Sequence, residues 1–245
     1  KEQQQEKFDE DFKRGIMERV KEIRREEIVY PHKHEKLKIN RKFTWKEFQG
    51  ALKTLQKKLH KAVGKDGVHN WMIVWGGEEL HKEQHECYNQ LWTEGVLPDE
   101  WNETIISYIY KGKGSRDEIT NYRPIGLTSA LVNLYKKMIL ARITDQLYRN
   151  ISVNQGGFRK GIGGREQLWA LVQEMEEAEE EGENMIVCTT DVHKAYDQVF
   201  REGTMYLLYA HGIRGRILTF LDKWMMGNVA YPMWRGVQGR MVRLD

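Results

Sequence analysis

The sequence is poor in the residues that hold small extracellular domains together. Only two cysteines occur in 245 residues, Cys87 and Cys188, too few for a disulfide framework or a four-cysteine zinc site. Four prolines, 40% hydrophobic residues and 11% aromatic residues argue against a disordered chain. No apolar run approaches the ~20 residues of a membrane helix, and no secretory signal is visible. These absences predict a folded, reduced, intracellular protein without a membrane span.

The N-terminal region, residues 1–42, is highly charged and begins with Lys1 instead of methionine, so we expect a piece of a longer protein. Its apolar residues recur at spacings of three to four, which predicts a long amphipathic helix. They are Phe8, Phe12, Ile16, Val20 and Ile23. A helix of this kind serves for packing or bridging.

Charge is unevenly distributed, although the net charge is only +3. Residues 101–170 hold eleven Lys and Arg against five Asp and Glu, whereas residues 171–183 hold seven Glu and no base. A basic segment next to an acidic one suits a polyanion-binding surface beside a solvated helix. Ordinary unevenness of surface charge explains the counts equally well.

Local signals predict a mixture of many helices and few strands. Thr44 and Glu47 form a capping-box pattern that predicts a helix from residue 45 to about 61. The β-branched and aromatic run at residues 104–110 predicts a strand. By the same criteria we expect further helices at residues 78–94, 129–149, 165–181, 203–211 and 215–226, a buried strand at 185–190 and a hairpin at 229–244. This mixture predicts an α+β fold with a helix-rich N-terminal part.

Asp191 directly follows the predicted buried strand at residues 185–190. A carboxylate held at the end of a buried strand can gather a hard divalent cation. The alternative is that Asp191 caps a following helix. Tyr196 would begin that helix and face the same site, whereas Asp197 would join a local hydrogen-bond network.

Cations flank the end of the strand predicted at residues 104–110. Lys111 and Lys113 follow it, and the chain returns through Arg123, which Pro124 fixes. Arg offers a bidentate fork and Lys a point charge, so this edge suits a triphosphate. Solvated loop charges are the alternative.

A glycine-rich loop at residues 155–165 combines one aromatic ring with several cations. Glycines allow close backbone approach, and Phe158, Arg159, Lys160 and Arg165 supply a stacking ring and phosphate contacts for single-stranded nucleic acid. A flexible hinge is the alternative. In contrast, His81 and His85 lack a third zinc ligand, so we expect them on a solvated helix face.

In order along the chain, these elements resemble the reverse transcriptase domain of non-LTR (LINE-type) retrotransposons. The resemblance extends from Phe43 to about Gly212. It rests on six runs, FTWKEFQGALKTLQ, KAVGKDGVHNWM, LWTEGVLPDEWNETIISYIYKGKG, NYRPIGLTSALVNLYKKMILARI, NQGGFRKGIGGREQL and TTDVHKAYDQV. Each run alone is a weak signal, but six in register identify the family.

The resemblance implies the fingers of a right-hand polymerase over residues 43–184 and the start of its palm over 185–245. Asp191 would be the first catalytic aspartate, with the Val192 carbonyl as a further ligand of Mg²⁺, and Tyr196 the steric gate under the incoming sugar. Lys111 and Arg123 would hold the triphosphate, and Gln155, Phe158 and Arg159 would follow the template. The implied partners are an RNA template and a DNA primer, and the implied compartment is the nucleus.

The sequence departs from the family at its carboxylates. The two-ion chemistry of nucleotidyl transfer needs several carboxylates, and the family's Asp-Asp pair after an aromatic-x dipeptide does not occur here. We therefore expect a catalytically incomplete fragment of a reverse transcriptase. The alternative is a domesticated descendant, retained as a structural subunit or as an RNA- or protein-binding module of a larger complex, for which an organellar location stays open.

Overall fold

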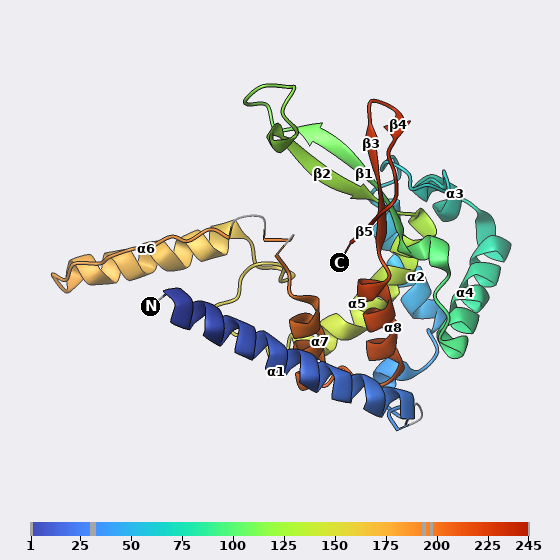
Figure 1. Cartoon of the computed structure of the whole chain (residues 1–245), viewed down its shortest axis with the longest axis horizontal. Coiled ribbons are helices and arrows are strands. Elements are labelled where there is room, and N and C mark those ends of the chain that lie inside the picture. Colours follow the sequence, from blue (N-terminus) through green and yellow to red (C-terminus); the bar gives the residue numbers. More distant parts are fainter. Residues whose placement is uncertain (1, 30–32, 193–194, 197, 245) are drawn as a thin grey trace. The chain divides into compact units, whose positions relative to one another are not determined.

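The computed structural model describes residues 2–29, 33–192, 195–196 and 198–244 (Figure 1). They belong to two compact units. Lys1–Gln146 and Arg201–Asp245 form one, called here the discontinuous unit, and Leu147–Phe200 form the other, the inserted unit. Helices and a small mixed sheet make up the described residues, which confirms the predicted α+β class.

The sheet belongs to the discontinuous unit. Its strands are β1 (Glu103–Tyr110), β2 (Tyr122–Leu127), β3 (Val229–Trp234), β4 (Val237–Gln238) and β5 (Val242–Arg243). The order is β2-β1-β3-β4, with β5 also paired to β3. β2 runs antiparallel to β1, whereas β3 runs parallel to it, so the two sequence segments of the unit meet in one sheet. The strand predicted at 104–110 and the hairpin predicted at 229–244 are confirmed.

Seven α-helices are described in the discontinuous unit. They are α1 (Glu2–Val29), α2 (Trp45–Gln56), α3 (Asn70–Val74), α4 (Gly77–Glu94), α5 (Ala130–Leu147), α7 (Arg201–Ala210) and α8 (Arg216–Met226). The predicted capping box is present, since the Thr44 hydroxyl accepts from Glu47 N and a Glu47 oxygen accepts from Thr44 N. α2 ends at Gln56, short of residue 61, and the short helix α3 was not predicted.

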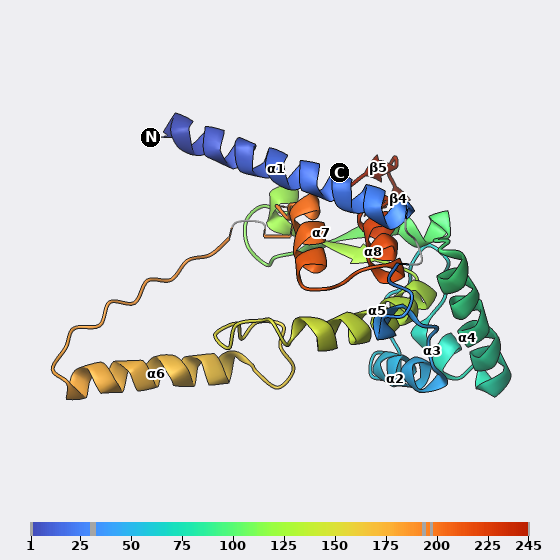
Figure 2. The same ribbon diagram turned by 90° about the horizontal axis from the view of Figure 1, so that it is seen from below.

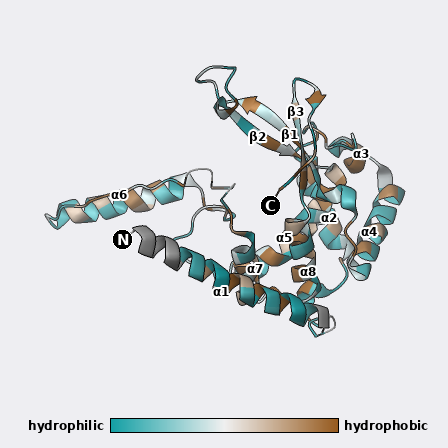
Figure 3. Ribbon diagram, viewed as in Figure 1, coloured by the Kyte–Doolittle hydropathy of each residue, from teal (hydrophilic) through white to brown (hydrophobic). Residues whose placement is uncertain are grey.

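α1 packs against the C-terminal helices of the unit (Figures 1 and 2). Val20 and Ile23 are buried, and Arg24 donates two hydrogen bonds to Asp222 of α8, at 2.9 and 2.6 Å. In Figure 3 the helix is mainly hydrophilic with hydrophobic residues at intervals, as an amphipathic helix requires. The Phe8 side chain lies outside the described part. The helix therefore has a packing role.

Aromatic side chains from α4, α5 and α8 build the core. Tyr135 is fully buried, and its ring centre lies 5.0 Å from that of Tyr88 and 5.2 Å from that of Phe220. Trp92 joins the cluster at 5.8 Å from Phe220. Tilted and edge-to-face pairs of this kind add to the free energy gained by burial.

Asn40 ties the N-terminal segment to α8. Its buried side chain donates to the carbonyls of His34 and Arg214, and its oxygen accepts from the backbone N–H of Ile217, in the first turn of α8, at 3.0 Å. This satisfies one of the N–H groups that a helix leaves open at its N-terminus. The Asn40 carbonyl also accepts from the Trp92 indole at 3.0 Å.

The inserted unit contains α6 (Gly164–Glu180), which confirms the predicted Glu-rich helix. The prediction of a buried strand at residues 185–190 is wrong, because this segment is exposed and belongs to no strand; Ile186 is 92% exposed. A strand needs a neighbour for its backbone groups, and no described strand pairs with these residues. Of the helices described, none is both long and apolar enough to cross a bilayer.

Candidate nucleotide and nucleic-acid site

The predicted triphosphate cations, Lys111 and Arg123, lie on one face of the β1–β2 pair. Ile109 is directly opposite Arg123, so these two side chains share a face, and Lys111, two residues after Ile109, continues it. Both cations are exposed, and the Lys111 ammonium donates to the Thr120 carbonyl at 2.6 Å. The cations are therefore diagonal neighbours, an arrangement that suits a ligand with several negative charges.

The connection between β1 and β2 is held by side chains. The Tyr110 hydroxyl donates to the Gly114 carbonyl at 2.5 Å, and the Tyr122 hydroxyl donates to the Arg116 carbonyl at 2.8 Å. Gly114 has φ +80, and a β-carbon there would lie 2.4 Å from the Asn121 side chain. Glycine is therefore required at this turn. Lys111 and Arg123 thus flank a connection whose conformation is fixed by its own side chains.

The glycine-rich loop is organised around Tyr148. The Tyr148 hydroxyl donates to the Phe158 carbonyl and accepts from the Lys160 N–H, both at 3.1 Å. Arg159 donates to the carbonyls of Ser152 and Val153, at 3.2 and 3.3 Å. The Arg159 guanidinium thus holds the loop together, a contact that sequence reasoning did not anticipate.

Phe158 stands out within this loop. Its backbone is left-handed, with φ +62, and its side chain is 92% exposed. Both features are unfavourable for an aromatic residue, and such outliers concentrate at functional positions. Near it, Gln155 donates to the Gly157 carbonyl at 3.3 Å, and the side chains of Lys160 and Arg165 are exposed.

Asp191, Val192 and Tyr196 lie on the surface of the inserted unit. Val192 is 64% exposed and Tyr196 81%, and Asp191 is exposed as well. The prediction that Tyr196 begins a helix is wrong, since Tyr196 lies in a turn and the next described helix begins only at Arg201. The same observation argues against the alternative that Asp191 caps a following helix. A short helix depends on packing, and these exposed residues supply none. The prediction for Asp197 lies outside the described residues.

Oxygen donors of the kind that Mg²⁺ prefers are present at Asp191 and Val192, but they are too few. Mg²⁺ is bound through carboxylates, carbonyls and water, and a two-ion site needs several carboxylates. Within the described part of the chain, no group of three or more His, Cys, Asp or Glu gathers in a metal-binding arrangement. These residues fit the metal in kind and do not complete its site.

The prediction of a solvated face for His81 and His85 is wrong. Both are half-buried, and their Nε2 atoms lie 2.7 Å from the Ile73 carbonyl and 2.8 Å from the Phe43 carbonyl, respectively. The spacing explains this result, because residues three or four apart share a helix face and these histidines precede the buried Tyr88 and Trp92. They connect α4 to neighbouring segments.

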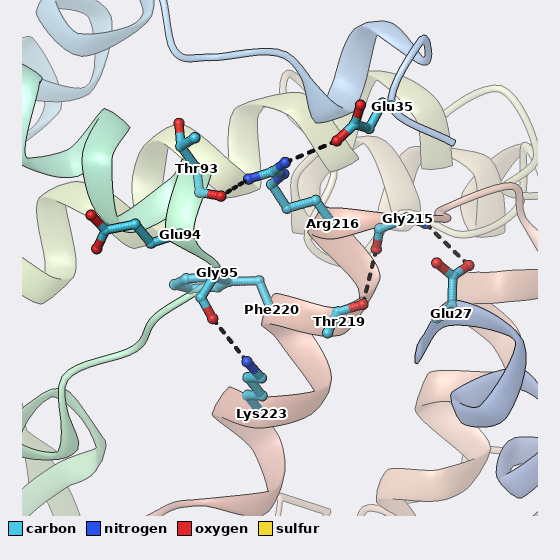
Figure 4. Close-up of a pocket in the computed structure, with 10 residues that line it drawn as sticks. All are labelled: Glu27, Glu35, Thr93, Glu94, Gly95, Gly215, Arg216, Thr219, Phe220 and Lys223. Carbon is cyan, nitrogen blue, oxygen red and sulfur yellow. Dashed lines mark hydrogen bonds and ion pairs between the residues drawn. The ribbon is translucent and has the colours of Figure 1, made fainter. Parts of the chain in front are cut away.

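A cavity of about 370 Å³ lies between the C-terminal end of α4 and α8 (Figure 4). Arg216 donates to the Trp92 carbonyl at 2.6 Å, and Lys223 donates to the Gly95 carbonyl at 2.8 Å. Cations at a helix C-terminus satisfy its open carbonyls and its dipole. Arg216 also pairs with Glu35 at 3.3 Å, so the cations of this cavity serve the fold.

Known proteins match the part of the chain that carries these residues. A family profile described as "Reverse transcriptase (RNA-dependent DNA polymerase)" matches residues 110–241, more than half of the chain. The chain belongs to the reverse transcriptase family. The matched span includes every candidate residue from Lys111 to Tyr196.

Curated relatives place this reverse transcriptase domain with those of non-LTR elements. The chain is 28% identical over 150 residues to the RNA-directed DNA polymerase from mobile element jockey of Drosophila melanogaster, covering 60% of this chain and 16% of the relative. Identity is 31% over 148 residues to the jockey polymerase of Drosophila funebris, with 60% and 16% covered, and 29% over 118 residues to a probable polymerase from transposon BS of Drosophila melanogaster, with 47% and 13% covered. The chain therefore spans about a sixth or less of the length of these relatives. The LINE-type assignment from ordered motifs is confirmed.

Proposed function

We propose that this chain supplies the fingers, over residues 43–184, and the beginning of the palm, over residues 185–245, of an RNA-directed DNA polymerase. On its own it does not add nucleotides. The observation that carries the proposal is the family match, which contains all the candidate residues in one continuous span.

Lys111 and Arg123 act in this proposal on the triphosphate of the incoming nucleotide. Their shared face and diagonal placement on adjacent strands support this role. Arg123 offers two parallel N–H donors to phosphate oxygens, and Lys111 adds a point charge once it exchanges the Thr120 carbonyl for the ligand. Cations held on neighbouring strands in this way stabilise the charge of the phosphates.

The glycine-rich loop acts on the template strand. Phe158 stacks on a base, while Lys160 and Arg165 neutralise phosphates. Arg159 both holds the loop through the carbonyls of Ser152 and Val153 and contributes positive charge. Gln155, which is exposed at the start of the loop, contacts the strand through its amide.

Asp191 and the Val192 carbonyl contribute the first protein ligands of the Mg²⁺ site. When bound, the metal ions would activate the primer hydroxyl and neutralise the triphosphate. Tyr196 excludes a 2′-hydroxyl by contact. The sequence contains no Asp-Asp pair, so the remaining carboxylates come from outside this chain. This is the physical reason for its inactivity alone.

Primer extension tests the proposal. The purified chain is given a primed RNA template, deoxynucleotides and Mg²⁺, and no extension is expected. A chain lengthened with a segment that supplies the downstream carboxylates is expected to extend the primer, and Asp191→Asn should abolish this activity. If the 245-residue chain extends the primer and this activity depends on Asp191, the proposal that the catalytic site is incomplete is contradicted. An inactive lengthened chain that remains folded would instead favour a retained structural or binding module.

A further inference from the structure

The sheet has a second surface, opposite to the one that carries Lys111 and Arg123. Tyr108 and Tyr110 alternate with Ile109 on β1, so they face the other side, and Tyr122 is directly opposite Tyr110. Trp234, from β3, contacts both Tyr108 and Tyr122. We call these four residues the aromatic face.

Ring contacts connect all four residues of the aromatic face. The ring centres of Tyr122 and Trp234 are 4.8 Å apart, and those of Tyr108 and Trp234 are 5.9 Å apart. Tyr110 and Tyr122 follow at 5.4 Å. The rings are tilted or edge-to-face, so no ring covers its neighbour as a stacked pair would. Trp234 is 37% exposed and the tyrosines are half-buried.

One arginine stands at each end of the aromatic face. The Arg116 guanidinium lies 5.3 Å from the centre of the Tyr110 ring, and that of Arg235 lies 5.8 Å from Trp234. In the described structure neither is paired with a carboxylate. Both cations thus keep their charge available beside an aromatic ring.

The position of Arg235 has a conformational cost. It occupies the turn between β3 and β4 with φ +49, a left-handed conformation that glycine or asparagine adopts more easily. The following residue, Gly236, has φ +83 and completes the turn. An arginine in this strained place, beside an exposed tryptophan, indicates that its charge is used.

We propose that the aromatic face binds single-stranded nucleic acid, with bases on the rings and phosphates at Arg116 and Arg235. Aromatic rings that are at least partly exposed and lie next to cations suit sequence-tolerant binding of single strands, because every base has a π-face and every nucleotide a phosphate. The hydroxyls of Tyr110 and Tyr122 are already bound to loop carbonyls, so the rings interact through their faces. This surface lies across the sheet from Lys111 and Arg123, the residues proposed to hold the triphosphate.

Fluorescence anisotropy of labelled RNA and DNA of about 20 nucleotides tests the proposal, at about 50 and 200 mM salt, with the full chain. Trp234→Ala is compared with Trp75→Ala, which removes a 65%-exposed tryptophan from outside the face. Arg235→Gln, which retains a side chain in the strained turn, is compared with Arg25→Gln, an exposed arginine of α1. Phe158→Ala reports on the proposed template loop, and thermal unfolding is measured for every variant.

We expect Trp234→Ala to weaken binding about tenfold at both salt concentrations, as the loss of one stacked base predicts. Arg235→Gln should weaken binding mainly at low salt, and the two control variants should bind like the parent chain. If Trp234→Ala binds as tightly as the parent chain, the proposal that the aromatic face binds nucleic acid is overturned, even if the unfolding temperature of the variant falls. If Phe158→Ala weakens binding and Trp234→Ala and Arg235→Gln do not, the proposal for the aromatic face would also be overturned, and the proposed polymerase function would stay intact. If the parent chain binds no nucleic acid at low salt, both the proposal for the aromatic face and the proposed template-binding role of the glycine-rich loop are overturned.

Discussion

Arg142 of α5 and Glu47 of α2 form a two-pronged ion pair, with Nε to Oε1 at 2.7 Å and Nη2 to Oε2 at 3.0 Å. All five guanidinium donors are used, because the remaining hydrogen bonds go to the carbonyls of Ile39, Arg41 and Lys42. The guanidinium carbon also lies 4.0 Å from the centre of the Phe43 ring. One buried cation thus joins α5 to the capping box and to the segment that precedes it.

Removing this cation should be costly. Arg142→Ala leaves the Glu47 carboxylate and three carbonyls without their partner, so we expect a loss of about 3–5 kcal/mol in the free energy of unfolding. Arg142→Lys should recover little, because lysine lacks the planar fork. Urea unfolding measures both, with Arg25→Ala as the control for an exposed arginine. A loss for Arg142→Ala below about 1 kcal/mol would show that the pair does not hold the two helices.

The same pair makes stability depend on acidity. Burial opposes the charge of Glu47, but hydrogen bonds from Arg142 and Thr44 outweigh it and hold its pKa at about 2, below the ordinary 4.5. Ionised Glu47 therefore stabilises the fold above about pH 4.5, and this contribution is lost as the pH falls toward about 2. Because a fifth of the side chain is exposed, we expect about 1–2 kcal/mol. The advantage over Glu47→Gln in urea unfolding should shrink between about pH 6 and pH 3; a constant difference would contradict the pKa.

Lys136 should destabilise the fold at neutral pH. Burial lowers the pKa of its ammonium to about 8, and its Nζ lies 4.3 Å from the centre of the Trp224 ring. Below about pH 8 Lys136 is charged in both states, so the folded state carries the full free-energy cost of burying the charge. Between about pH 8 and the ordinary pKa of 10.5, the folded protein loses this proton while the unfolded chain keeps it, so stability rises with pH and the cost disappears. The ring offsets part of it. We expect Lys136→Met to gain about 1 kcal/mol at pH 7 and nothing near pH 10.5, measured against Lys53→Met. No gain at pH 7 would mean that the ring compensates burial in full.

Charge and stacking in the glycine-rich loop should respond differently to salt. Phe158→Ala should cost about 1–3 kcal/mol in binding of single-stranded RNA at any salt concentration, because stacking is not ionic. Lys160→Gln should cost less as salt rises, since each neutralised phosphate releases about 0.7 counterion on a single strand. Lys160 suits this comparison better than Arg159, which also holds the loop through the Ser152 carbonyl. Filter binding at two salt concentrations separates the two effects, and parallel losses for both variants would refute the division of roles.

Tyr196 should control the choice of sugar once the polymerase site is complete. In a lengthened, active chain, Tyr196→Ala should admit ribonucleotides more readily, because its ring would no longer contact a 2′-hydroxyl. The ratio of kcat/KM for deoxynucleotides and ribonucleotides measures this effect, and Phe158→Ala, on the template loop, should leave the ratio unchanged. An unchanged ratio in Tyr196→Ala would remove the residue from the gate role.

Sequence patterns were informative where the interacting residues are close along the chain. The capping box of α2 could be predicted because Thr44 and Glu47 are three residues apart. Arg142 could not be recognised as buried, because its partners are 95 to 103 residues away and a charged residue in a helix ordinarily faces water. The prediction of a strand before Asp191 was wrong for the same reason, because a strand depends on a neighbouring strand that local composition does not encode.

The candidate site shows the same division. The shared face of Lys111 and Arg123 follows from an antiparallel return, which Pro124 and the flanking glycines indicate. The alternation in TIISYIY places Tyr108 and Tyr110 together, but their meeting with Trp234 depends on a parallel pairing with a strand more than a hundred residues later. Nothing local indicated that Tyr148 would organise the glycine-rich loop.

The discontinuity of the larger unit has a consequence for how the protein is made. Tyr135 packs on Phe220, and Asn40 binds the backbone of Ile217, 177 residues away. A ribosome adds about 5–20 residues per second, so it needs about 4–16 seconds to proceed from Leu147, where α5 ends, to Met226, where α8 ends. Throughout that interval the rings of α4 and α5 have no α8 to cover them, and the β3 side of β1 lacks its neighbour. The nascent chain is therefore vulnerable to aggregation until α8 emerges, and chaperones that bind apolar segments have an opportunity to act in that interval.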